Sequence, residues 1–109
     1  MKPKVYVAGP YTIGDVAVNV RNAFEVADKI LSLDLVPFVP HFTHFWHMLS
    51  PRDYNDWIKY DQEFIPLCSA LYRISGESKG ADLEVEIAKA LPIPIFYNLD
   101  DLANHFKNR

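Results

Sequence analysis

The chain has 109 residues, of which 50% are hydrophobic and 14% aromatic. This length and composition predict a single folded domain over residues 1–109 and exclude a disordered chain. Its net charge of −3 excludes the basic surface that duplex nucleic acid requires. The single cysteine, Cys68, excludes an internal disulfide, and no apolar run approaches the ~20 residues that span a membrane, so we expect a cytoplasmic protein.

The first half of the chain alternates short apolar runs with one long amphipathic segment. Residues 5–8 predict a buried strand that Gly9-Pro10 stops, and residues 15–33 carry the period of a helix. Residues 36–39 predict a second strand, at a sheet edge because Pro37 cannot donate to a neighbouring strand. The aromatic and histidine-rich residues 40–47 are then expected to form a loop.

The second half repeats this alternation. Ser50-Pro51-Arg52-Asp53 has the cap, proline and acid of a helix start, and the helix is expected to end near residue 67. A strand (70–74), a loop (75–80), a helix (80–91), a strand (93–97) and a short helix (99–106) follow. This order predicts an α/β fold with a parallel sheet covered on both faces. Ligands of such sheets bind beyond the carboxyl ends of the strands, where loops 9–14, 41–50 and 75–80 would meet.

Two carboxylates fall on apolar helix faces. On the helical wheel Glu84 shares its side with Gly80, Ala81, Ile87, Ala88 and Leu91. Asp61 has a similar apolar setting in residues 54–68. A buried acid is costly unless it is paired, neutralised or used, so both are candidate active-site residues. Glu84 could act as a general base or as a carboxylate nucleophile, or it could be a structural carboxylate. Asp61 could instead hold two loops together.

Further polar residues allow a ligand-binding or a structural interpretation. Ser78 stands at a helix N-terminus, where it binds an anion or only caps the helix. Asn19 either contacts a ligand or caps the Gly9-Pro10 turn. Arg73 ends the third strand, where it offsets Glu84 or Asp61, binds an anion, or forms a surface salt bridge.

His41, His44 and His47 form an H-x2-H-x2-H run within the aromatic segment. Three imidazoles can bind zinc, but no cysteine lies nearby to support a metal site. We favour a pocket in which Trp46 and its aromatic neighbours stack on a planar base while His44 contacts its polar edge. No metal site is therefore predicted.

Three segments carry a resemblance to a known family: Val5-Tyr6-Val7-Ala8-Gly9-Pro10-Tyr11, Asp61, and Ser78-Lys79-Gly80-Ala81-Asp82-Leu83-Glu84. Together they resemble the nucleoside 2-deoxyribosyltransferase superfamily, which includes the deoxyribonucleoside 5′-monophosphate N-glycosidases. The likeness covers nearly the whole chain. It implies a flavodoxin-like or Rossmann-like three-layer sandwich with a four- to five-stranded parallel sheet, and a homodimer or larger homo-oligomer.

The resemblance also implies roles for individual residues. Glu84 matches the nucleophile that attacks the sugar at C1′, Asp61 the acid near the sugar, and Tyr6 the hydroxyl that orients the nucleophile. Gly9 matches the glycine of the substrate-facing turn, and Ser78 a serine that contacts a 5′-phosphate. The expected substrate-binding residues are Gly9, Pro10, Asn19, His44, Trp46, Arg73, Ser78 and Gly80.

The expected reaction is cleavage or transfer of the N-glycosidic bond of a (deoxy)nucleoside or its 5′-monophosphate, without a cofactor. Phosphate-binding relatives carry a basic residue shortly after the first glycine, whereas this chain has Pro10, Tyr11, Thr12 and Ile13 there. The alternative is a non-catalytic nucleotide-binding or sensing module on the same fold.

Overall fold

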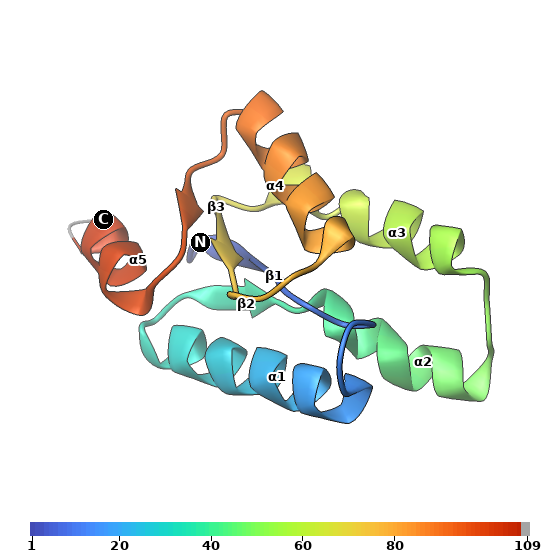
Figure 1. Ribbon diagram of the computed structural model, residues 1–109. Helices are drawn as coiled ribbons and strands as arrows, with labels where there is room; N and C mark the ends of the chain where they lie inside the picture. Colours follow the sequence, from blue (N-terminus) through green and yellow to red (C-terminus); the bar gives the residue numbers. More distant parts are fainter. Residues whose placement is uncertain (108–109) are drawn as a thin grey trace.

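The computed structural model describes residues 1–107, in which strands and helices alternate along the chain (Figure 1). The elements are β1 (Lys4–Ala8), α1 (Val16–Ser32), β2 (Val36–Phe38), the 3₁₀ helix η1 (Pro40–Phe42), α2 (Thr43–Leu49), α3 (Tyr54–Gln62), the 3₁₀ helix η2 (Ile65–Leu67), β3 (Ala70–Arg73), α4 (Lys79–Ala90), β4 (Ile95–Phe96) and α5 (Leu99–Phe106). Within these residues no helix combines the length and the apolar character needed to cross a membrane.

The strands form a parallel sheet, which confirms the expected α/β, flavodoxin-like fold. In the described part of the chain the sheet has four strands in the order β2-β1-β3-β4. Pro37 pairs with Val5 on the edge strand β2, as the sequence predicts. Because α1 leads from β1 to one edge and α4 leads from β3 to the other, the strand order reverses between β1 and β3. A crevice is expected beyond the carboxyl ends of these two strands.

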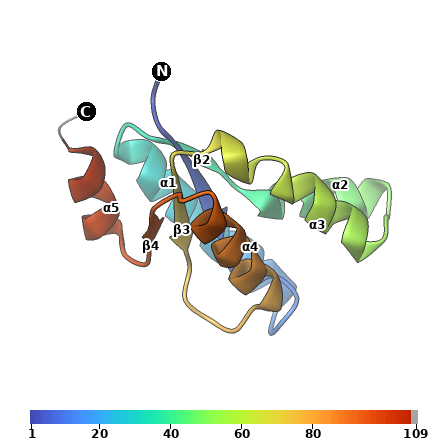
Figure 2. The same ribbon diagram turned by 90° about the horizontal axis from the view of Figure 1, so that it is seen from above.

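Apolar side chains cover both faces of the sheet. Val5 and Val7 of β1 pack with α1 and α5 on one face. Tyr6 and Ala8 point to the opposite face, where α4 and η2 complete a second core cluster. Figures 1 and 2 show α1 and α4 on opposite sides of the sheet. The alternation of β1 therefore directs the Tyr6 side chain towards α4.

The segment between β2 and β3 differs from the prediction. The expected loop 40–47 contains η1 and most of α2, and Ser50 closes α2 through its backbone N–H instead of starting the next helix. The next helix, α3, begins after Asp53, whose carboxylate accepts a hydrogen bond from the Asn55 backbone. It ends at Gln62 rather than near residue 67, and η2 follows.

The last strand is also shorter than predicted, covering only Ile95–Phe96 of residues 93–97. The backbone N–H of Ile93 donates to Ala88 at the end of α4, and Pro94 has no N–H to donate. The Pro94 carbonyl accepts a hydrogen bond from the Leu71 backbone of β3 at 3.0 Å, but the pairing with β3 begins only at Ile95.

Candidate active site

Glu84 and Tyr6 meet between α4 and the sheet. Ser78 caps α4 by accepting a hydrogen bond from the Ala81 backbone at 3.1 Å, which fixes where the helix begins. Glu84 then lies on the inward face of the second turn, with 8% of its surface exposed. The fully buried Tyr6 hydroxyl donates a hydrogen bond to Glu84 Oε2. This contact joins β1 to α4.

Asp61 supplies a second buried carboxyl from α3, with 7% of its surface exposed. Burial and the nearby charge of Glu84 raise its pKa to about 8. Burial raises the pKa of Glu84 to about 7, against the hydrogen bond from Tyr6 and the charge of Arg73, which both lower it. The Tyr6 pKa is raised by burial and by Glu84, so its hydroxyl stays protonated. Both carboxyls therefore ionise less readily than free side chains, and the pKa of Asp61 is raised further than that of Glu84.

A pocket opens beside the two carboxyls and encloses about 570 Å³ of empty space, its mouth included. Its lining comes from the β1–α1 loop, from η1 to α2, from α3 and from the start of α4: Gly9, Tyr11, Pro40, His41, Thr43, His47, Tyr54, Trp57, Ile58, Asp61, Ser78, Gly80, Ala81 and Glu84. It occupies the expected place at the switch in strand order.

Five of the eleven predicted site residues line this pocket. Glu84, Asp61, Gly9, Ser78 and Gly80 line it, and Tyr6 reaches it through Glu84. At Gly9 an added Cβ would lie 3.0 Å from the Ile74 side chain, so a larger residue would require Ile74 to shift where the turn passes the end of β3. The remaining predicted residues, Pro10, Asn19, His44, Trp46 and Arg73, are absent from the lining.

Asn19 and Pro10 hold the loop that follows β1. The Asn19 side-chain amide donates to the backbone carbonyls of Tyr11 at 3.0 Å and Ile13 at 2.8 Å. The Pro10 carbonyl lies 2.9 Å from Nε2 of His41. Both residues thus position the loop that carries Gly9 and Tyr11 into the pocket.

The three histidines have separate partners. His41 bonds to the Pro10 carbonyl, His44 Nδ1 lies 2.8 Å from the Tyr11 hydroxyl, and His47 Nδ1 accepts from Trp57 Nε1 at 2.9 Å. Among residues 1–107 no group of three or more His, Cys, Asp or Glu side chains is placed to hold a metal ion. His41 and His47 line the pocket, whereas His44 braces the loop.

Aromatic side chains do surround the pocket, but from a different helix than predicted. Trp46 packs edge-on against Trp57 at 5.0 Å and Tyr60 at 5.6 Å, outside the lining. Tyr54, Trp57 and Asp61 share the inner face of α3 at helical spacing. The sequence predicted only an apolar setting for Asp61 within residues 54–68, although the i, i+3, i+7 spacing of these three residues could have assigned the two aromatic side chains to the site.

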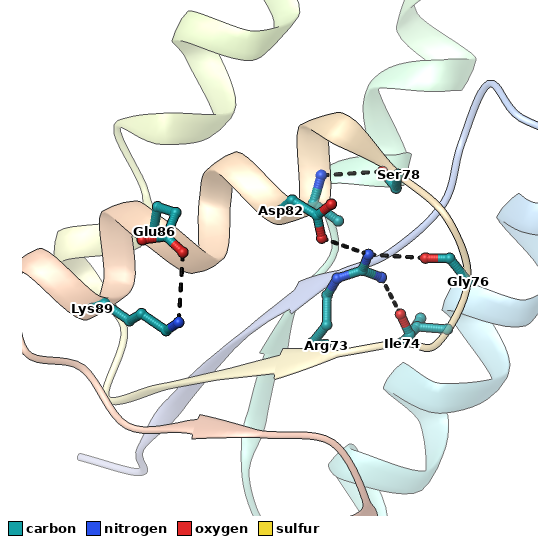
Figure 3. Close-up of polar contacts among 8 residues, drawn as sticks. Arg73, Ile74, Gly76, Ser78, Asp82, Glu86 and Lys89 are labelled. Carbon is teal, nitrogen blue, oxygen red and sulfur yellow. Dashed lines mark hydrogen bonds and ion pairs between the residues drawn. The ribbon is translucent and has the colours of Figure 1, made fainter.

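Arg73 supports the start of α4 from the end of β3 (Figure 3). Its guanidinium donates to the Ile74 carbonyl, to the Gly76 carbonyl at 2.9 Å and to Asp82 at 3.0 Å. The residue is 8% exposed, and its side chain is turned towards the β3–α4 loop. Arg73 therefore fixes the loop before α4 and places a positive charge near Glu84.

Replacing Arg73 with methionine is expected to raise the pKa of Glu84 above about 7, because the charge that favours the carboxylate disappears. An NMR titration that follows the Glu84 side chain measures the shift, which we expect to reach about half a pH unit or more. Lys89→Met is the control for the loss of a nearby cation, since Lys89 lies on the exposed surface of α4 and pairs with Glu86 at 3.5 Å. Equal titrations of Arg73→Met and wild type would contradict the assigned effect.

Comparison with known proteins agrees with this geometry at the level of family and fold. Residues 3–98 match the model of the family described as Domain of unknown function (DUF7768). The chain belongs to this family. A search of curated proteins gives no match.

Among solved structures, the DUF7768 chain is similar to the 2-deoxyribosyltransferase from the psychrotolerant bacterium Bacillus psychrosaccharolyticus. The two share 20% sequence identity with a TM-score of 0.61, over 84% of this chain and 69% of the other. The resemblance predicted from the sequence is thus confirmed for the fold.

Proposed function

We propose that this DUF7768 protein cleaves or transfers the N-glycosidic bond of a (deoxy)nucleoside or its 5′-monophosphate. The observation that carries the proposal is the hydrogen bond from Tyr6 to Glu84 at the wall of a pocket that Asp61 also lines. A carboxylate held by a donor, beside a second carboxyl that retains its proton, is a pair suited to glycosidic bond cleavage. The fold it shares with a 2-deoxyribosyltransferase supports the same chemistry.

In the first step Glu84 attacks C1′ of the sugar. The Tyr6 hydroxyl binds Oε2 and orients the group, so we assign the attack to Oε1. The new C1′–O bond forms as the C1′–N bond breaks, and the Asp61 carboxyl transfers its proton to the departing base. Asp61 is suited to this role because its pKa of about 8 keeps it protonated at neutral pH.

In the second step water or another base attacks C1′ of the glycosyl–enzyme from the face that the first base left. Asp61, now a carboxylate, takes the proton of the incoming nucleophile, and Glu84 leaves as a carboxylate. Two displacements at C1′ retain its configuration. Hydrolysis and base transfer differ only in the acceptor.

The pocket lining suggests how a nucleoside would lie. Tyr54 and Trp57 offer apolar faces to a planar base. Ser78 and Gly80, at the beginning of α4, line the same pocket beside the Tyr54 hydroxyl, and backbone N–H groups there favour the 5′-hydroxyl or a phosphate. The sugar would then lie next to Glu84.

A panel of nucleosides and 5′-monophosphates tests the proposal directly. The purified protein is incubated with each compound, with and without a second free base, and the released base is separated by chromatography. Release of free base supports hydrolysis, and a new nucleoside supports transfer. If no compound on the panel yields either product, the proposed reaction is wrong.

A further inference from the structure

The hydroxyl of Tyr54 lies against the beginning of α4, where the pocket passes into a second groove. Tyr54 is the first residue of α3, and a Cβ added at Gly80 would lie 3.1 Å from its hydroxyl oxygen. The second groove runs between the β1–α1 loop and the residues that lead into α4, and Tyr54 and Gly80 line both this groove and the pocket. The hydroxyl therefore lies at the passage between the two cavities.

This hydroxyl is not engaged by the protein. Within residues 1–107 it has no hydrogen-bond partner, and Tyr54 is half-exposed. The Tyr11 hydroxyl, which also lines the pocket, lies 2.8 Å from His44 Nδ1. The Thr43 hydroxyl, a third member of the lining, donates to the Pro40 carbonyl at 3.0 Å. Tyr54 therefore keeps its hydroxyl available to a ligand, as a donor or as an acceptor.

The charges around the Tyr54 hydroxyl disfavour an anion beside it. Burial raises the pKa of this hydroxyl, and the negative charges of Glu84 and Asp61 raise it further. Among residues 1–107, no Lys or Arg lines the pocket, and Lys79 in the groove is accompanied by Glu77. A neutral hydroxyl group is therefore a better partner for Tyr54 than a doubly charged phosphate.

The proposed placement of a nucleoside brings its 5′ end to this hydroxyl. The base and the 5′ carbon of a nucleoside lie on the same face of the sugar. A tyrosine ring that packs against the base can therefore reach the 5′ oxygen with its hydroxyl. The 5′ oxygen would then lie beside Gly80, at the passage towards the groove.

We propose that the Tyr54 hydroxyl binds the free 5′-hydroxyl of the substrate, so that the site takes an unphosphorylated nucleoside in preference to its 5′-monophosphate. The inference rests on the proposed function, because it assigns the 5′ position of the same site. Tyr54 acts here as a specificity-determining residue, and the nucleophile and acid remain Glu84 and Asp61.

The test uses three compounds that differ only at the 5′ position: deoxyadenosine, 2′,5′-dideoxyadenosine and deoxyadenosine 5′-monophosphate. If the panel identifies another nucleoside as the best substrate, its 5′-deoxy and 5′-phosphate forms replace them. Wild type is expected to favour the nucleoside over each of the other two by at least about fivefold in kcat/KM. Tyr54→Phe keeps the ring and removes the hydroxyl. We expect this variant to lose at least about fivefold on the nucleoside and to match wild type, within about twofold, on the 5′-deoxy compound.

Tyr60→Phe is the matched control. Tyr60 lies on the same helix and packs against Trp46 and Phe64, outside the pocket lining, so the loss of its hydroxyl should change neither rate. A merely structural role of Tyr54 would lower the rates on the nucleoside and on its 5′-deoxy analogue by the same factor. Equal losses on the two compounds in Tyr54→Phe would therefore overturn the inference.

Cleavage of the 5′-monophosphate as fast as the nucleoside, or faster, would also overturn the inference and would leave the proposed function intact. If Tyr54→Phe does not fold, the three wild-type rates decide alone. If no compound is cleaved, calorimetric titration of wild type with the same three compounds separates the two ideas. Tighter binding of the nucleoside than of the other two supports the inference without the reaction, and equal or absent binding overturns it.

Discussion

Replacing Glu84 with glutamine is expected to lower kcat/KM for nucleoside cleavage by at least about a thousandfold. The amide keeps the size of the side chain and can still accept the Tyr6 hydrogen bond, but it is a poor nucleophile towards C1′. Initial rates of base release with the best substrate of the panel measure the effect. Binding of the same nucleoside should persist, because the pocket lining is otherwise unchanged.

Glu86→Gln is the matched control for this experiment. Glu86 lies on the exposed side of the same helix and forms an ion pair with Lys89 at 3.5 Å, so its loss should leave the rate unchanged. A wild-type rate in Glu84→Gln would refute the nucleophile assignment. Ligand-induced thermal stabilisation of wild type without turnover would instead favour a nucleotide-binding module.

Replacing Asp61 with asparagine is expected to flatten the pH dependence of stability. The pKa of this carboxyl is raised from 3.8 to about 8, so the folded state holds its proton more tightly than the unfolded state does. Its stabilising effect is complete below pH 3.8 and is lost as the pH rises through about 8. Between pH 5 and 9 the free energy of unfolding should fall by about 2–4 kcal/mol less in the variant than in wild type.

Urea denaturation at several pH values measures this difference. Asp56→Asn is a suitable control, because Asp56 lies exposed on the same helix and pairs with Arg52 at 3.3 Å. It should lose stability with pH as wild type does. Glu84 contributes a pH dependence of the same sign, so some slope remains in Asp61→Asn. An unchanged slope in Asp61→Asn would show that its carboxyl is not held protonated by the fold.

Much of the fold could be predicted because local patterns and tertiary packing agree. Gly9-Pro10 ends a strand that is buried on both faces, and the periodicities of α1, α4 and α5 place their apolar sides on the sheet. The segment around α2 gave no such pattern, since none of its residues is buried. A short helix exposed in this way has no contrast between an apolar and a polar face. Its histidine-rich and aromatic sequence therefore lacks a helical period and predicted a loop.

The carboxylates of the site could be predicted for a related reason. Glu84 and Asp61 break an apolar stripe, and such an exception is visible in the sequence alone. The directions of the other polar side chains are not visible in the sequence. Asn19 turns from α1 to the backbone of the β1–α1 loop, and Arg73 turns from β3 to the β3–α4 loop. Both orientations depend on hydrogen bonds to carbonyl groups that no spacing of residues reveals.

The packing around Trp57 has a practical consequence. The chain contains two tryptophans, and Trp57 lines the pocket while Trp46 lies against it with ring centroids 5.0 Å apart. The indole N–H of Trp57 is held by His47, which lines the same pocket. A bound base would change the polarity around one indole and quench or shift the intrinsic fluorescence of both. The protein therefore carries its own optical reporter, and titration with unlabelled compounds should yield dissociation constants without any added dye.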